Sequence, residues 1–197
     1  MGCGEGPGER QDEMSIIYGE RVRLRAAERE DIKTFHRWVN DPEVTQELAL
    51  YLPMSMVDEE TWFNGMTQRD PNEKSLVIEV REGMDWRMIG NSGVFGIEWV
   101  NRCGELGILI GEKTEWNKGY GTEVMTMLQQ HCFKTLNLNR IFLRVYAENR
   151  RAIRAYEKAG FVAEGRMREA VYKNGKYDDV ILMSVLRSEW SASTKEK

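Results

Sequence analysis

The feature that most constrains the fold is a strand, a glycine-rich turn and a helix that follow one another near the middle of the chain. Residues 104–111 form an apolar, strand-like run, and the turn that follows holds Gly119 and Gly121 just before a helical pattern over 122–136. The first turn of a helix presents unpaired N–H groups and the positive end of the helix dipole. Glycines let that backbone close on an anion without a Cβ in the way. The order of these elements predicts a site for a phosphorylated ligand.

The spacing of the glycines excludes two common phosphate-binding loops. A P-loop requires Gly-x-x-x-x-Gly-Lys-Ser/Thr, and Gly111 does not begin that pattern. A dinucleotide fingerprint requires a third glycine where Val124 stands. Taken alone, the turn fits a ligand-binding loop and an ordinary tight turn about equally well.

A second strand and helix follow the first pair. Residues 140–147 alternate in polarity as a strand does, and Asn149 is suited to cap a helix that begins near Arg150. Gly160 is suited to the position just after the end of that helix. Tyr156 lies about two helical turns beyond Asn149, which places it at a depth where it can face the same cleft. Because a helix crosses between the two strands, we expect them to be parallel neighbours.

Together the two segments resemble the cofactor-binding motifs of the GNAT N-acetyltransferases. The acetyl-CoA loop of that family reads Gln or Arg, two residues, Gly, one residue, then Gly or Ala; residues 118–121 fit it, and Trp116 stands at the Gln or Arg position. An aromatic residue before the loop is familiar in the branch of ribosomal-protein alanine and spermidine acetyltransferases. The pattern Asn-x-x-Ala-x-x-x-Tyr-x-x-x-Gly-Phe, from Asn149 to Phe161, resembles the second signature of the family. The resemblance extends over about residues 22–190.

The resemblance implies that acetyl-CoA is the acetyl donor. The N–H groups of residues 118–122 would bind its pyrophosphate, Asn149 would help to hold the pantetheine arm, and a backbone N–H near Leu109 would polarise the thioester carbonyl. The predicted cofactor-binding residues are Leu109, Ile110, Trp116, Lys118, Gly119, Tyr120, Gly121, Thr122, Asn149 and Ala152.

Two residues are predicted to be catalytic. Acetyl transfer to an amine needs a base for the amine proton and an acid for the leaving thiolate. By the resemblance, Tyr156 lies near the thioester sulfur; an unperturbed tyrosine has a pKa near 10 and stays protonated at neutral pH, so Tyr156 is the candidate acid. Glu105 is the first candidate for the base, acting through water, and Glu98 on the preceding strand is its rival. Either carboxylate could equally be an exposed strand charge.

The identity of the acceptor amine stays open between a polyamine, an amino-sugar nucleotide and a protein N-terminus. We expect its site between the first two helices and the loop before the last strand. Acidic residues over 41–60 would attract a cation there, although capping of a helix explains Asp58, Glu59 and Glu60 better. A non-catalytic acyl-CoA-binding sensor is the alternative function, and loss of the tyrosine or of the glycine loop would favour it.

The expected fold is a single-domain, GNAT-like α/β fold. Its mixed, mostly antiparallel, twisted sheet would have six to seven strands flanked by about four helices. Helices are expected near 30–40, 58–68, 122–136 and 150–159. Strands are expected near 21–26, 76–81, 88–100, 106–110, 140–147, 161–172 and 176–186, the last two joined by an Asn-Gly hairpin turn.

Residues 16–190 are assigned to this domain, residues 1–15 to a disordered segment in which Met14 is an alternative start to Met1, and residues 191–197 to a flexible tail. The net charge of -4 argues against a nucleic-acid partner. No apolar run approaches a membrane span, and three cysteines without regular spacing fit a reduced, cytoplasmic protein. No metal site is expected, and the sequence leaves a homodimer open.

Overall fold

The computed structural model describes residues 16–195, so the predicted disordered segment 1–15, with Met14, lies outside the described residues. The strands are β1 Ile17–Tyr18, β2 Val22–Ala26, β3 Leu76–Glu82, β4 Asp85–Glu98, β5 Cys103–Ile110, β6 Arg140–Tyr146, β7 Val162–Lys173 and β8 Lys176–Leu186. The α-helices are α1 Ile32–Val39, α2 Pro42–Thr45, α3 Met56–Thr67, α4 Tyr120–Gln130, α5 Arg150–Lys158 and α6 Arg187–Lys195. Short 3-10 turns lie at Arg29–Asp31 and Lys113–Glu115, and a π-helical turn extends α4 over His131–Thr135.

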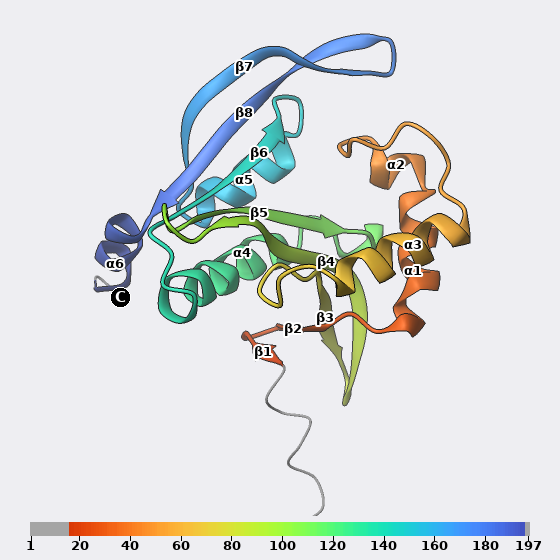
Figure 1. Cartoon of the computed structure of the whole chain (residues 1–197), viewed down its shortest axis with the longest axis horizontal. Coiled ribbons are helices and arrows are strands. Elements are labelled where there is room, and N and C mark those ends of the chain that lie inside the picture. Colours follow the sequence, from red (N-terminus) through yellow and green to blue (C-terminus); the bar gives the residue numbers. More distant parts are fainter. Residues whose placement is uncertain (1–15, 196–197) are drawn as a thin grey trace, which may run out of the picture.

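One mixed sheet runs through the molecule in the order β1-β2-β3-β4-β5-β6-β8-β7 (Figure 1). Among the described strands only β5 and β6 pair in parallel, and the other neighbours are antiparallel. The single-domain α/β fold and the parallel pairing of the two motif strands are therefore confirmed. The sheet has eight strands instead of six to seven, since the two-residue strand β1 adds to one edge.

The helix count is also higher than expected, with six α-helices in residues 16–195 instead of about four. Helix α2 is one of the additional helices: its first residue, Pro42, suits the first helical position, and the Asp41 side chain caps the turn by accepting a hydrogen bond from the N–H of Glu43. Helix α6 continues through most of the segment predicted to be a tail from residue 191, up to Lys195.

The sheet separates two apolar layers. Successive side chains of β3 point to opposite faces of the sheet and so into different layers. Val77 packs with Phe35 and Trp38 of α1, whereas Ile78 packs in the larger cluster that contains the buried face of α4. In Figure 1, α1, α2 and α3 lie together at one end of the molecule and α4, α5 and α6 lie toward the other. A ligand that passes between central strands can thus meet residues from both layers.

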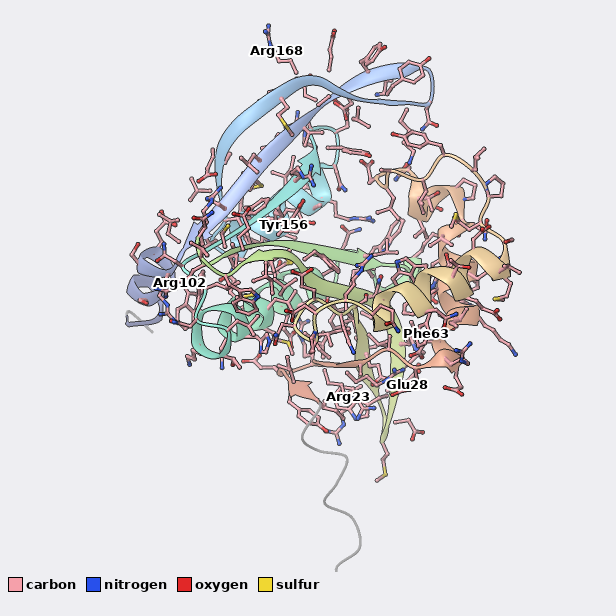
Figure 2. All side chains as sticks on the ribbon, in the orientation of Figure 1. Arg23, Glu28, Phe63, Arg102, Tyr156 and Arg168 are labelled. Carbon is pink, nitrogen blue, oxygen red and sulfur yellow. The ribbon has the colours of Figure 1, made fainter. Side chains whose placement is uncertain are left out.

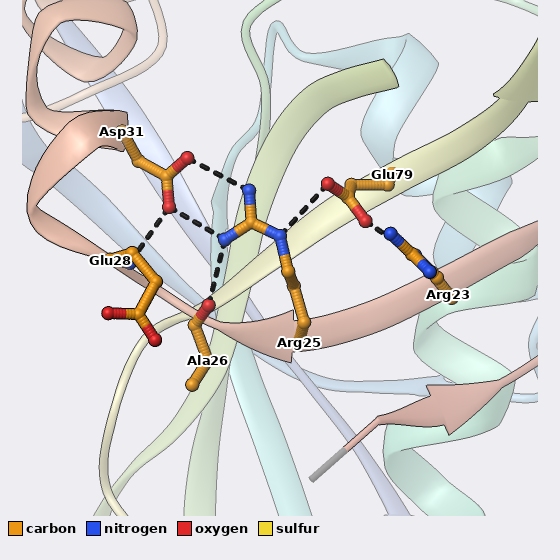
Figure 3. A network of polar contacts seen from close by, with 6 residues as sticks. All are labelled: Arg23, Arg25, Ala26, Glu28, Asp31 and Glu79. Carbon is orange, nitrogen blue, oxygen red and sulfur yellow. Dashed lines mark hydrogen bonds and ion pairs between the residues drawn. The ribbon is translucent and has the colours of Figure 1, made fainter. Parts of the chain in front are cut away.

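An ionic network fixes the connection from β2 to α1 (Figure 3). Arg25 donates to both carboxylate oxygens of Asp31 and, through Nε, to Glu79 on β3 at 2.9 Å. Arg23 donates to the other oxygen of Glu79, whose side chain is buried. The hydrogen bonds that Arg25 donates to Asp31 raise the pKa of Arg25, so the pair stays ionised. Asp31 also accepts from the N–H of Glu28, which anchors the start of the first helix to the sheet.

The β7–β8 hairpin reaches from one side of the molecule across to α2 (Figure 1). Its turn at Asn174 and Gly175 has positive φ angles of 53° and 81°, as the Asn-Gly sequence predicted. Next to the turn, the Lys173 ammonium donates to the backbone carbonyls of Thr45 and Leu48. The hairpin therefore holds the chain just after α2 in place.

Candidate active site

The central opening of the molecule lies where two parallel strands separate. β5 pairs with β6 only from Cys103 to Glu105, after which β6 continues along β8 and β5 continues along β4. Alternate N–H and C=O groups of a strand point to its two sides, so beyond Glu105 the groups of β5 that face β6 have no pairing with that strand. A cleft of about 460 Å³ fills this gap. It offers backbone donors to a bound molecule.

The glycine turn and the start of α4 form one end of the cleft. Gly119 has φ +88° and is the N-cap of α4, and no side chain of the described residues caps this end. A Cβ built on Gly121 would meet no atom within 4 Å, because the glycine faces the open cleft. Uncapped N–H groups, the helix dipole and free space together make a cradle for an anion.

Arg21, the residue before β2, holds this turn in place, and no local sequence pattern predicts that role. Its Nη1 donates to the carbonyl of Lys118 at 3.0 Å, and its Nε pairs with Glu123 at 2.8 Å. Its guanidinium also lies 4.9 Å from the centre of the Tyr120 ring. The backbone N–H of Arg21 donates to the same Glu123 carboxylate. The clamp fixes the turn from outside the cleft.

Trp116 belongs to the wall of the cleft. Its indole Nε1 donates to the carbonyl of Ile110 at 2.7 Å, which closes the end of β5, and the guanidinium of Arg151 lies 3.7 Å from the ring centre. The ring therefore supports Arg151, a cation that lines the cleft. The Lys118 ammonium pairs with the buried carboxylate of Glu115 at 3.0 Å, and Lys118 is not among the residues that line the cleft. Binding of the pyrophosphate by its backbone N–H stays a prediction.

Helix α5 forms the opposite wall. The Asn149 side chain accepts a hydrogen bond from the N–H of Ala152 at 3.0 Å, which confirms it as the N-cap, and Gly160 follows the helix with φ +91°. Tyr156 lines the cleft and packs edge-on against Phe161 (Figure 2 shows Tyr156 near the centre of the molecule). Burial raises the pKa of Tyr156 to about 12, because the phenolate would be poorly solvated there.

The two carboxylates considered as bases lie in different places. Glu105 lines the cleft, and both of its oxygens accept hydrogen bonds from Arg144 of β6, at 2.8 and 2.9 Å. Glu98 does not line the cleft and bonds to the side chain of Asn101 in the turn after β4. Of the two, only Glu105 is near the opening.

The cleft gathers eleven of the twelve predicted site residues, all except Lys118. Its lining includes Glu105, Leu109, Ile110, Trp116, Gly119, Tyr120, Gly121, Thr122, Asn149, Ala152 and Tyr156. Sequence reasoning missed Arg151, and it named Glu47 only as part of an acidic region.

In the part of the chain that the structure describes, no group of three or more His, Cys, Asp or Glu residues is placed to hold a metal ion. Within the same residues, no helix combines the length and apolar character needed to cross a membrane.

The acetyltransferase (GNAT) domain family matches residues 21–162. A spermidine N(1)-acetyltransferase of Vibrio cholerae is 29% identical over 170 residues, 86% of this chain and 95% of the relative. An uncharacterized N-acetyltransferase, p20, of Bacillus licheniformis is 29% identical over 183 residues, 90% and 99% of the two chains.

A solved structure supports the same family. The crystal structure of the Vibrio cholerae spermidine N-acetyltransferase in complex with CoA and spermine superposes with a TM-score of 0.79 and 29% identity, covering 87% of this chain and 98% of that one. These relatives are named N-acetyltransferases, and the one with this solved structure shares the overall fold, which favours an enzyme over a non-catalytic sensor.

Proposed function

The chain belongs to the GNAT acetyltransferase family and is an acetyl-CoA-dependent N-acetyltransferase, and we propose that it passes the acetyl group by direct attack to a primary amine of a polyamine. The observation that carries this proposal is the cleft itself. An uncapped helix start, a strand separated from its neighbour and a buried tyrosine face one opening. The first can bind a pyrophosphate, the second a carbonyl oxygen and the third a leaving sulfur.

The residues of the cleft fit acetyl-CoA. The N–H groups at the start of α4 would bind the pyrophosphate, and three further cations on α5, namely Arg151, Arg154 and Lys158, line the same opening. The open space at Gly121 leaves room for the phosphates close to the backbone. Asn149 keeps its amide nitrogen free for the pantetheine arm, since only its oxygen serves the helix cap.

In the proposed reaction the amine nitrogen attacks the thioester carbonyl, so that a C–N bond forms and the C–S bond breaks. Backbone N–H groups of β5 near Leu109 stabilise the negative charge that develops on the carbonyl oxygen. Tyr156 donates its phenolic proton to the leaving sulfur, while Glu105, through water, takes the proton from the nitrogen. Tyr156 regains a proton from solvent before the next turnover.

A polyamine is favoured over the other two acceptors by the named relatives and by the charge at the opening. Glu47, just after α2, lines the cleft and is half-buried. Burial and the nearby Asp178 raise the pKa of Glu47, although the cations Lys173 and Arg151 act in the opposite direction. A cationic amine would relieve both effects.

The test of this function is thiol release from acetyl-CoA against a panel of amines. The panel contains spermidine, an amino-sugar nucleotide, arylalkylamines and peptides with alanine or serine at the N-terminus. We expect turnover with spermidine well above turnover with the others. Turnover confined to the peptides or to the amino sugar would contradict a polyamine acceptor, but the assignment as an acetyltransferase would still hold.

Replacement of Glu105 by glutamine tests the base. We expect a lower rate at neutral pH, with acetyl-CoA affinity unchanged. Because Glu105 is proposed to act through water, the loss should be near the lower end of the usual range for general-base catalysis, about 10²-fold. Above the pKa of the amine itself the two rates should converge, because the acceptor then arrives without its proton. A pH–rate profile identical to wild type would reject Glu105, and Glu98→Gln, outside the cleft, is the matched control.

Removal of the Arg21 clamp tests the glycine turn. Arg21→Ala should weaken acetyl-CoA binding by about tenfold, equivalent to about 1.4 kcal/mol. The arginine side chain is half exposed, so the loss is expected to be below the upper range for charged hydrogen bonds. Isothermal titration with acetyl-CoA measures it. Arg168→Ala, on the exposed strand β7 (Figure 2), should leave the affinity unchanged; an equal loss in both variants would show only a general charge effect.

A further inference from the structure

A second cleft, of about 290 Å³, lies on the α1 and α3 side of β5. It shares Leu48, Gly107, Ile108 and Leu109 with the first cleft, so the two meet at the part of β5 where the thioester is proposed to lie. Its walls are mainly apolar and include the rings of Phe35, Trp62 and Phe95. An acceptor that reaches the thioester from this side would pass its remaining length along these walls.

Glu59 is the one charged side chain among the residues that line this second cleft. Only 4% of Glu59 is exposed, yet no described residue donates a hydrogen bond to its carboxylate or forms an ion pair with it. Burial raises the pKa of Glu59, His36 acts in the opposite direction, and Asp58 adds to the rise. A buried carboxylate without a partner is costly unless a ligand supplies the missing donor.

Glu59 lies in the first turn of α3, where an acidic side chain also suits the helix dipole. Capping of α3 is completed by Ser55 and Asp58, which form a reciprocal capping box, so Glu59 is not needed there. Glu59 instead falls on the helix face of Trp62 and Phe63, which packs toward the sheet. Of the three residues predicted to share a capping role, Asp58 caps α3, and Glu59 lies in the first turn without taking part in the cap. A carboxylate on an otherwise apolar face points to binding.

We propose that Glu59 binds a second ammonium group of the acceptor, separated from the reacting amine by an apolar chain. This inference rests on the proposed function. An ammonium group brings three donors to the unpaired carboxylate, and the aromatic rings of the wall also attract a cation. The side-chain oxygen of Asn91, which is buried without a partner and belongs to the same lining, adds a second acceptor. Methylene groups between the two nitrogens pack against the apolar walls.

The test compares linear diamines of increasing chain length with n-alkylamines of the same length. In the wild type, kcat/KM for the best diamine should exceed that of its matched monoamine by about 30-fold or more, the factor expected for a buried charge pair worth at least 2 kcal/mol. Glu59→Gln should remove that preference and leave the monoamines nearly unchanged. Glu60→Gln, an exposed neighbour on the same helix, should keep the wild-type ratio.

A second variant keeps the test independent of misfolding. Glu59→Leu completes the apolar face of α3, so it should unfold at a higher temperature than the wild type while it prefers the monoamines. An unchanged ratio of diamine to monoamine in both Glu59 variants would overturn the inference alone. An equal loss for diamines and monoamines would also overturn it, because Glu59 would then act on the reacting amine. Absence of turnover with every amine would overturn the proposed function together with this inference.

Discussion

Replacing Tyr156 by phenylalanine should lower kcat for acetyl transfer by about 10²- to 10⁴-fold, the usual contribution of a general acid. The ring would still pack against Phe161, so the change removes only the hydroxyl group from the cleft. Without a proton donor the sulfur must leave as a thiolate in a poorly solvated place. Affinity for acetyl-CoA should change little, because the phosphate cradle on α4 is untouched.

The pH dependence of the rate is a second test of Tyr156 as the acid. Burial raises the pKa of Tyr156 to about 12, above its ordinary value near 10, so the phenol stays protonated at every pH below that range. The wild-type rate should therefore show no loss of the acid through pH 10, where an exposed tyrosine would already be half ionised. Steady-state kinetics from neutral to alkaline pH measure this. Tyr172→Phe, at the exposed hairpin tip, is the control; if Tyr156→Phe retains the wild-type rate, Tyr156 is not the acid.

Much of this site could be predicted because its residues are close together along the chain. The glycine turn with the helix after it, and the pair Asn149 and Tyr156, each lie within a few helical turns, so local spacing fixes their relation. The parallel pairing of their strands followed from the helix between them. Residues 140–161 therefore fold as the sequence pattern suggests.

Long-range contacts could not be predicted from the sequence, because their residues are far apart along the chain. Arg21 lies 102 residues before Glu123, and Lys173 lies 125 residues after Leu48, yet these pairs set the cofactor turn and the chain after α2. No local pattern marks one arginine or lysine as a tertiary clamp among 28 such residues. The role of Glu59 was hidden similarly, since its neighbours Asp58 and Glu60 are exposed and only the tertiary fold buries the residue between them.

The second large effect is expected from Gly111→Ala, which should destabilise the protein by about 3 kcal/mol or more. A Cβ at Gly111 would lie 2.1 Å from Cδ2 of Trp38 and 2.4 Å from Cγ, far inside van der Waals contact. Trp38 is 3% exposed and packs with Phe35, Val44 and Val77, so the ring has little room to retreat. The glycine is therefore required by α1, although it lies just after β5 and beside the cofactor turn.

Thermal unfolding separates this steric clash from the general effect of replacing a glycine. For a domain of this size, about 3 kcal/mol corresponds to a fall in Tm of about 6–12 °C. Gly65 is the matched control, because it lies inside α3 and a Cβ there would meet no atom within 4 Å. Gly65→Ala should stabilise the helix by about 0.5–1 kcal/mol, a change of opposite sign. If Gly111→Ala instead left Tm unchanged, Trp38 would have to be free to move, and the apolar layer that supports the acceptor cleft would not be rigid.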